Sequence, residues 1–121
     1  MDFFYIYTME TTSFQQGIID FFENIATYYG IKTEITQGLF SELGHFDAEL
    51  TAWNLSEFVL IRSAYRNSGA KFMMEGNGTY FEISAEKIIS FQKNGRHKFE
   101  FIEKYSNTVF RITKIRFHYK Y

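Results

Sequence analysis

Three side chains that bind metals or transfer protons alternate along one short stretch, His45, Asp47 and Glu49. On a strand all three would point to one side, where they could bind a metal ion or supply a general base with its orienting partner. On a helix they would not converge. A ligand set normally gathers from separate elements, and no other part of the sequence completes this one. We therefore interpret the stretch as the solvated face of an amphipathic element and predict no metal site.

The other candidate catalytic groups form no recognisable motif. His97 and His118 each lie among basic residues, and the chain has no cysteine, which excludes thiolate nucleophiles and Cys-ligated metals. Gly76-Asn77-Gly78 is not followed by a predicted helix, so it is not a phosphate-binding loop. We predict a non-enzymatic protein without a cofactor. The alternative is a small enzyme or ligand-binding domain with a pocket between helix and sheet.

The C-terminal strand predicts a basic face. Its even positions carry Lys114, Arg116, His118 and Lys120. The odd positions carry Ile115, Phe117, Tyr119 and Tyr121. A period of two separates cations from apolar side chains on a strand. Cations neutralise phosphates and rings stack on unpaired bases, so the stretch is a candidate nucleic-acid-binding site. The alternative is an ordinary solvated sheet face whose charges discourage edge pairing.

The net charge of −1 conceals an asymmetry between the two halves of the chain. Residues 1–60 contain nine acidic residues and one basic residue, a formal charge of −8, whereas residues 61–121 contain twelve basic and five acidic residues, a charge of +7. The halves either face and neutralise each other or form one acidic and one basic surface. The acidic candidates for a partner-binding face are Asp20, Glu23, Glu42, Asp47 and Glu49.

Protein binding is the function that we predict from these features. An acidic face speeds encounter with a basic protein, and aromatic anchors supply affinity. Aromatic residues make up 21% of the chain, too many for all to be core, so part of them is expected to form an exposed binding surface. We predict a domain of the inhibitor or immunity type that neutralises a basic protein by occlusion. Nucleic-acid binding through the basic sheet face is the alternative.

The length and hydropathy pattern predict a single domain, 1–121, outside the membrane. No apolar run is long enough to cross a bilayer, and the N-terminus lacks a signal-peptide pattern. The absence of cysteine fits a reducing compartment, so we predict a cytoplasmic protein.

The positioning elements predict an α+β fold. A strand is expected over Asp2–Met9, and a long helix from about residue 12 to residue 29 ends at Gly30. Ile31–Thr36 is expected to be a short strand. Leu39–Trp53 fits a helix or a strand and is assigned as helix on its length. Leu55–Arg66 fits both patterns as well, so one or two further helices are expected.

The C-terminal part, from about residue 70 to residue 121, predicts an antiparallel β-meander. A type I′ turn at Asn77-Gly78 would place Met74 opposite Phe81. A three-residue loop over Lys93-Asn94-Gly95 would place Ile89 opposite Phe99. The apolar phase reverses between Phe110 and Ile115, which predicts a bulge near Thr113.

Overall fold

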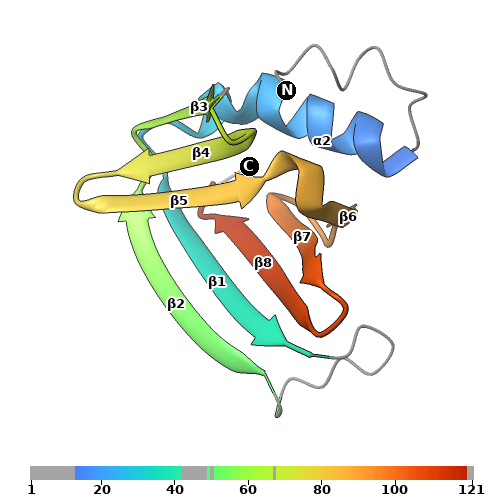
Figure 1. Ribbon diagram of the computed structural model, residues 1–121. Coiled ribbons are helices and arrows are strands. Elements are labelled where there is room, and N and C mark those ends of the chain that lie inside the picture. Colours follow the sequence, from blue (N-terminus) through green and yellow to red (C-terminus); the bar gives the residue numbers. More distant parts are fainter. Residues whose placement is uncertain (1–12, 42–48, 50, 67, 120–121) are drawn as a thin grey trace.

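The structure is a computed structural model that describes residues 13–41, 49, 51–66 and 68–119. Helix α2 (Ser13–Asn24) comes first, and the 3-10 helix η1 (Ile25–Tyr28) extends it. The strands are β1 (Lys32–Phe40), β2 (Ala52–Val59), β3 (Arg62–Arg66), β4 (Lys71–Gly76), β5 (Thr79–Ser84), β6 (Ile88–Lys93), β7 (Lys98–Ser106) and β8 (Val109–Phe117). The 3-10 helix η4 (Ala85–Lys87) connects β5 to β6. The described chain is thus mostly β with one α-helix (Figure 1), in outline the α+β fold that the sequence predicts.

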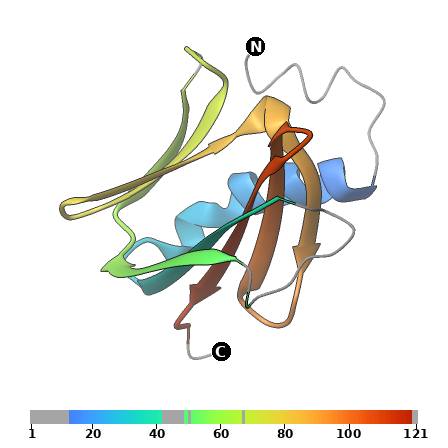
Figure 2. The same ribbon diagram turned by 60° about the horizontal axis from the view of Figure 1, so that its bottom comes forward.

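The strands form two antiparallel sheets. The larger has the order β2-β1-β8-β7-β6, and the smaller has the order β3-β4-β5. Helix α2 and the small sheet pack on one side of the five-stranded sheet, which we call its inner face. Figure 2 shows the helix behind the five-stranded sheet, with no described element in front of it. This second side is the outer face.

The predicted C-terminal meander is divided between the two sheets. Strands β4 and β5 belong to the smaller sheet, and β6, β7 and β8 belong to the larger one.

Aromatic side chains of α2 join both sheets in one hydrophobic core. The ring of Phe21 lies 5.3 Å from the ring of Phe101, which is fully buried on the inner face. The next ring, Phe22, stacks on Phe72 of β4 at 4.0 Å. Because these neighbouring helix residues contact different sheets, α2 fixes the position of the small sheet over the large one.

The predicted helix is confirmed over most of its length. Ile18, Phe21 and Ile25 are buried as the apolar stripe requires, and Gly30 has φ +86°, the left-handed conformation expected after a helix end. The last turn is a 3-10 helix, which tightens the chain before it enters β1. The predicted strand Asp2–Met9 lies outside the described residues.

A helix over Leu55–Arg66 is wrong, because this segment lies in β2 and β3. Charged side chains of this segment form ion pairs with neighbouring strands. Glu57 pairs with Lys32 at 3.3 Å and Arg62 pairs with Glu75 at 3.0 Å. Leu39–Trp53 is extended at both described ends, in β1 and β2, and the residues between lie largely outside the described part of the chain.

The first predicted hairpin has the expected register. Met74 lies opposite Phe81, and Gly76 lies opposite Thr79. The turn type differs, since Gly78 has a positive φ of +72° and Asn77 does not. Both central residues of a type I′ turn require positive φ, so the turn is not type I′.

The second hairpin differs from the prediction. Phe91 lies opposite Phe101, so the connection is longer than the three residues expected, and His97 adopts φ +63° within it. This register keeps Phe91 on the inner face beside α2. A register shift between Ile88 and Ser90 turns Ile89 toward the outer face. Contact with the helix therefore outweighs the turn preference of Asn94-Gly95.

The phase reversal in β8 has another cause than the predicted bulge. The pairing of β8 with β7 is regular through Thr113. Phe110 and Ile112 are buried with Phe40 in a second cluster on the outer face, whereas Ile115 is buried on the inner face. One regular strand thus contributes to two cores on opposite sides of the sheet.

Candidate interaction surface

Strand β2 places three exposed apolar side chains on the outer face. Trp53, Leu55 and Val59 are 39%, 58% and 50% exposed, and their spacing of two or four residues puts them on the same side. The ring of Trp53 lies against Gly38, where an added Cβ would come within 2.9 Å of the ring. Lys114 Nζ lies 5.4 Å from the centroid of the ring. Trp53 is therefore held between a glycine and a cation.

Charged side chains of alternating sign surround this apolar row. Arg116 of β8 lies 3.6 Å from Glu34 of β1, and His118 Nε2 lies 3.5 Å from the same carboxylate. On the other side of β8, Lys114 is opposite Glu100 in the pairing with β7. A hollow of about 300 Å³ lies among these charged side chains. It is lined by Glu34, Thr36, Asn94, Lys98, Phe99, Glu100, Lys114, Ile115 and Arg116. The outer face thus combines apolar anchors with charged side chains of both signs.

The predicted basic site is only partly assembled. Lys114, Arg116 and His118 lie on or beside the outer face, and Lys120 is outside the described residues. The ring of Phe117 lies on the inner face instead, where it stacks on Tyr28 at 3.8 Å. Rings and cations of β8 therefore point to opposite sides, as the alternation predicts. A nucleic acid bound to the cations of β8 could therefore not stack its bases on the Phe117 ring of the same strand.

The three predicted acidic residues that the structure describes, Asp20, Glu23 and Glu49, lie in two separate places. Asp20 and Glu23 are exposed on α2, and Asp20 accepts a hydrogen bond from Gln16 at 3.0 Å. Glu49 is exposed just before β2 begins, at the far end of β1 from the helix. Because β1 has nine residues, its two ends are about 25 Å apart, and Glu49 is distant from Asp20 and Glu23. Glu42 and Asp47 lie outside the described residues.

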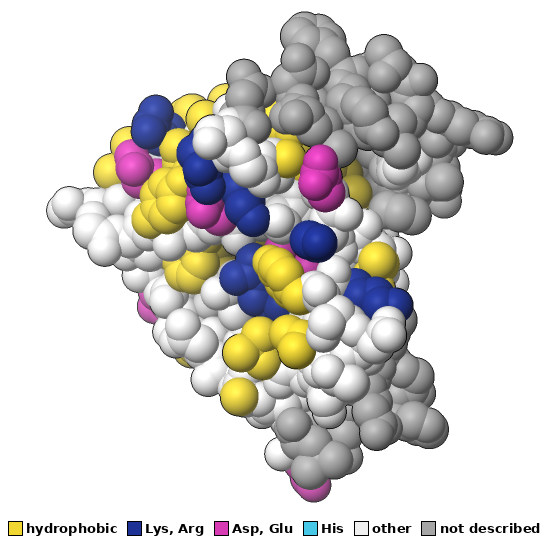
Figure 3. All heavy atoms as spheres, in the orientation of Figure 1, with side chains coloured by type: hydrophobic (Ala, Val, Ile, Leu, Met, Phe, Trp, Pro, Cys, Tyr) yellow, Lys and Arg dark blue, Asp and Glu magenta, His cyan; other side chains and the backbone are white. Residues whose placement is uncertain are grey.

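The two charged halves mix within the fold. Glu34 of the first half pairs with Arg116 and His118 of the second, but Arg66 and Glu82 pair within the second half at 2.8 Å. Figure 3 shows the same mixing on the side of the small sheet, where Lys and Arg side chains lie beside Asp and Glu. The separation of charge along the sequence is therefore not a separation into two surfaces over the described residues.

A buried carboxylate at the seam between the sheets was not predicted. Glu103 is fully buried and accepts hydrogen bonds from Arg111 Nε at 2.9 Å and from the Ser84 amide at 2.8 Å. The Tyr105 hydroxyl donates to it at 2.5 Å. Arg111 also donates to the Glu82 carbonyl at 2.7 Å. The cluster links β7 and β8 to β5, and its satisfied geometry indicates a structural role.

This cluster predicts a change of stability at alkaline pH. Burial, and then the hydrogen bond to Glu103, raise the pKa of Tyr105 well above its usual range. The unfolded chain gives up this proton from pH about 10, so unfolding becomes easier as pH rises above that value. Urea unfolding of Tyr105→Phe should show a shallower fall in stability between about pH 9 and about pH 11 than the parent. Parallel falls in both proteins would contradict the assignment.

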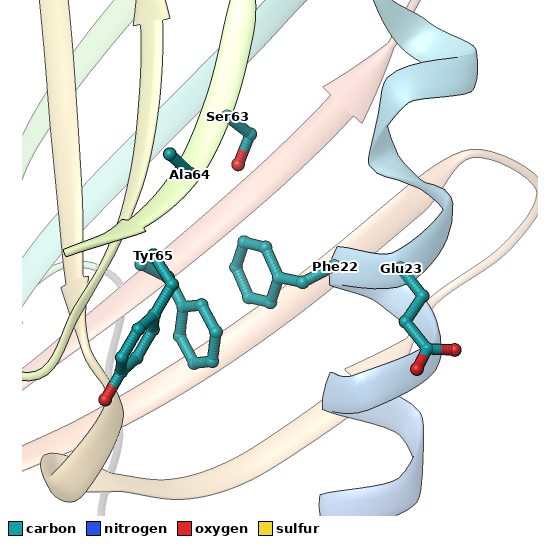
Figure 4. A pocket seen from close by; sticks show the side chains of 6 residues that line it. Phe22, Glu23, Ser63, Ala64 and Tyr65 are labelled. Atoms are coloured by element: carbon teal, nitrogen blue, oxygen red, sulfur yellow. The ribbon is translucent and has the colours of Figure 1, made fainter. Parts of the chain in front are cut away.

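The predicted pocket between helix and sheet is small. A cavity of about 180 Å³ is lined by Phe22, Glu23, Ser63, Ala64, Tyr65 and Phe72. Figure 4 shows the Glu23 carboxylate directed away from the rings of Phe22 and Tyr65. Ser63 Oγ donates to the Met73 carbonyl at 2.6 Å. Typical small-molecule sites measure about 300–1,000 Å³, so this cavity gives little support to a ligand pocket.

The structure describes only part of the candidate metal and catalytic groups. No group of three potential metal ligands occurs among the described residues, and His45 and Asp47 lie outside them. His97 Nδ1 lies 2.8 Å from the Tyr28 hydroxyl, a contact that joins the β6–β7 turn to η1. In the part of the chain that the structure covers, no helix has the length and apolar character needed to cross a bilayer.

Comparison with known proteins identified no relative. Protein-family models, curated proteins and solved structures each gave no match to the chain.

Proposed function

We propose that this chain is a non-enzymatic protein-binding domain of the inhibitor or immunity type, which acts by occluding its partner. The observation that carries the proposal is the row of Trp53, Leu55 and Val59, exposed on an outer face that no described element covers. Partly exposed aromatic and aliphatic side chains beside charged groups are typical of protein interfaces. Trp53, held in place before binding, is the expected anchor.

The arrangement of charge favours a protein over a nucleic acid. Glu34 and Glu100 lie among the cations of the outer face, and Glu57 pairs with Lys32 at its edge. A surface that binds the phosphate backbone gains its affinity from unopposed cations. A protein partner can match alternating charges, which set the specificity of the complex. The acidic helix residues would then guide the approach of a basic partner rather than form its main contact.

The test places a photo-crosslinking amino acid at Thr36, which lines the outer-face hollow, and separately at Thr27, which is exposed on η1 directly after α2. In nuclease-treated lysate of the native host, Thr36 is expected to give a crosslink to one protein and Thr27 is not. Crosslinking only at Thr27 would assign binding to the acidic helix. A crosslink at Thr36 that requires nucleic acid would favour the alternative function.

Trp53→Ala should then weaken the affinity for the identified partner by about tenfold to a hundredfold, because anchors of this kind dominate interface energies. Tyr80→Ala is the control, since Tyr80 is an exposed ring on the small sheet, 50% exposed against 39% for Trp53. Its affinity should stay within about twofold of the parent. Equal losses at both positions would contradict the assignment to the outer face.

A further inference from the structure

The edge of β2, with which no described strand pairs, differs from the other described sheet edges. The opposite edge, β6, is irregular between Ile88 and Ser90 and packs against α2. The β3 edge is short and carries Arg62 and Arg66. At the β5 edge, the Glu82 carbonyl accepts a hydrogen bond from Arg111 and the Ser84 amide donates to Glu103. By contrast, β2 has eight residues with one charged side chain, Glu57, and most of it is exposed. Long edges without bulges or charges are templates for pairing with another strand.

The backbone of β2 directs hydrogen-bonding groups away from the sheet. The Leu60 amide donates to the Ile31 carbonyl at 3.1 Å, beyond the end of the β1–β2 ladder. Bonding alternates along an antiparallel strand, so the even-numbered residues of β2 bond to β1. Leu55 and Glu57 therefore direct their amide and carbonyl groups outward. No described strand pairs with this edge.

We infer that β2 pairs with β2 of a second copy of this chain, antiparallel, with Leu55 on the two-fold axis. The two Leu55 residues then exchange both backbone hydrogen bonds, and their side chains, each 58% exposed in the single chain, cover one another. The two five-stranded sheets join into one sheet of ten strands. The pairing uses the edge of β2 and covers Leu55, which also belongs to the outer-face row, but the inference does not depend on the proposed function.

Charge complementarity selects this register. With Leu55 on the axis, Glu57 lies opposite Trp53 of the second copy, where Lys114 Nζ is 5.4 Å from the ring. Each Glu57 keeps its ion pair with Lys32 at 3.3 Å and is attracted at longer range by Lys114 of the second copy, and the symmetry repeats this arrangement. A shift that puts Glu57 on the axis would oppose two carboxylates, which is unfavourable.

Sedimentation velocity of the purified chain tests the pairing. Strand pairing alone buries a small area, so the dimer is expected to dissociate in the range of about 10–100 µM. Leu55→Lys places two like charges directly opposite each other and should raise the dissociation constant about tenfold or more, as should Leu55→Glu. Val109→Lys, at an exposed position on β8 away from the edge, should dimerise like the parent.

An equal mixture of the Leu55→Lys and Leu55→Glu chains should recover a heterodimer, because the opposite charges then meet on the axis. Far-ultraviolet circular dichroism checks that each variant is folded, as expected at an exposed edge position. The inference is overturned if the parent stays monomeric up to several hundred micromolar. Binding of an added extended peptide to the β2 edge would not rescue it, because the inference concerns a second copy of this chain. The inference is also overturned if Leu55→Lys dimerises as strongly as the parent, or if the mixture stays monomeric.

Discussion

Glu103→Ala should lower the free energy of unfolding by about 3–5 kcal/mol. Glu103 is fully buried and pairs with Arg111 at 2.8 Å, while the Arg111 side chain is only 24% exposed. Removing the carboxylate leaves the largely buried guanidinium without a counter-charge and leaves the Ser84 amide without its acceptor. Equilibrium unfolding in urea measures the loss, with the slope of the transition showing whether the native state stays compact.

Two further variants separate the ion pair from simple truncation. Glu103→Leu combined with Arg111→Met removes both charges and should cost clearly less than Glu103→Ala, because no unpaired charge remains. Glu86→Ala, at an exposed position of η4, should change stability by less than about 0.5 kcal/mol. A loss below about 1 kcal/mol for Glu103→Ala would show that the buried pair does not hold the two sheets together.

Phe101→Ala should destabilise the protein by about 3–5 kcal/mol, through lost burial and the cavity that remains. The Phe101 side chain has no exposed surface, and its ring lies 4.8 Å from Phe91 and 5.3 Å from Phe21. The substitution therefore opens a void where α2 meets both β6 and β7. Thermal and urea unfolding should agree on the size of the loss.

Phe99→Ala is the matched control, two residues earlier on the same strand and the same face. Phe99 is partly exposed beside the β6–β7 turn, so its neighbours and water can fill the space more easily. We expect the free energy of unfolding to fall by about half as much as in Phe101→Ala. Equal losses at the two positions would mean that the core does not centre on Phe101.

The sequence determined the features that depend on neighbours along the chain. The stripe of Ile18, Phe21 and Ile25 follows from helical spacing alone, and the pairing of Met74 with Phe81 follows from a two-residue turn. The alternation in β8 correctly placed Lys114 and Arg116 on the side opposite to Ile115. These are local patterns, so their physical cause is already present in short segments.

Only the tertiary structure decided which faces are covered and which charges meet. The reversed apolar phase at Phe110 and Ile112 is explained by the second buried cluster on the outer face. The alternation of side chains along one strand cannot show that both of its sides are buried. The helix expected over Leu55–Arg66 is replaced by strands, in which Glu57 pairs with Lys32 of β1, twenty-five positions earlier in the sequence.

The candidate surface depends on the same long-range pairing. The carboxylate beside Arg116 belongs to Glu34, and the cation over Trp53 belongs to Lys114, each from a strand distant in sequence. Composition predicted exposed aromatic residues and a basic strand, but strand order placed acidic side chains among the cations. Register between distant strands is set by packing of the whole core against α2, so local sequence could not reveal it.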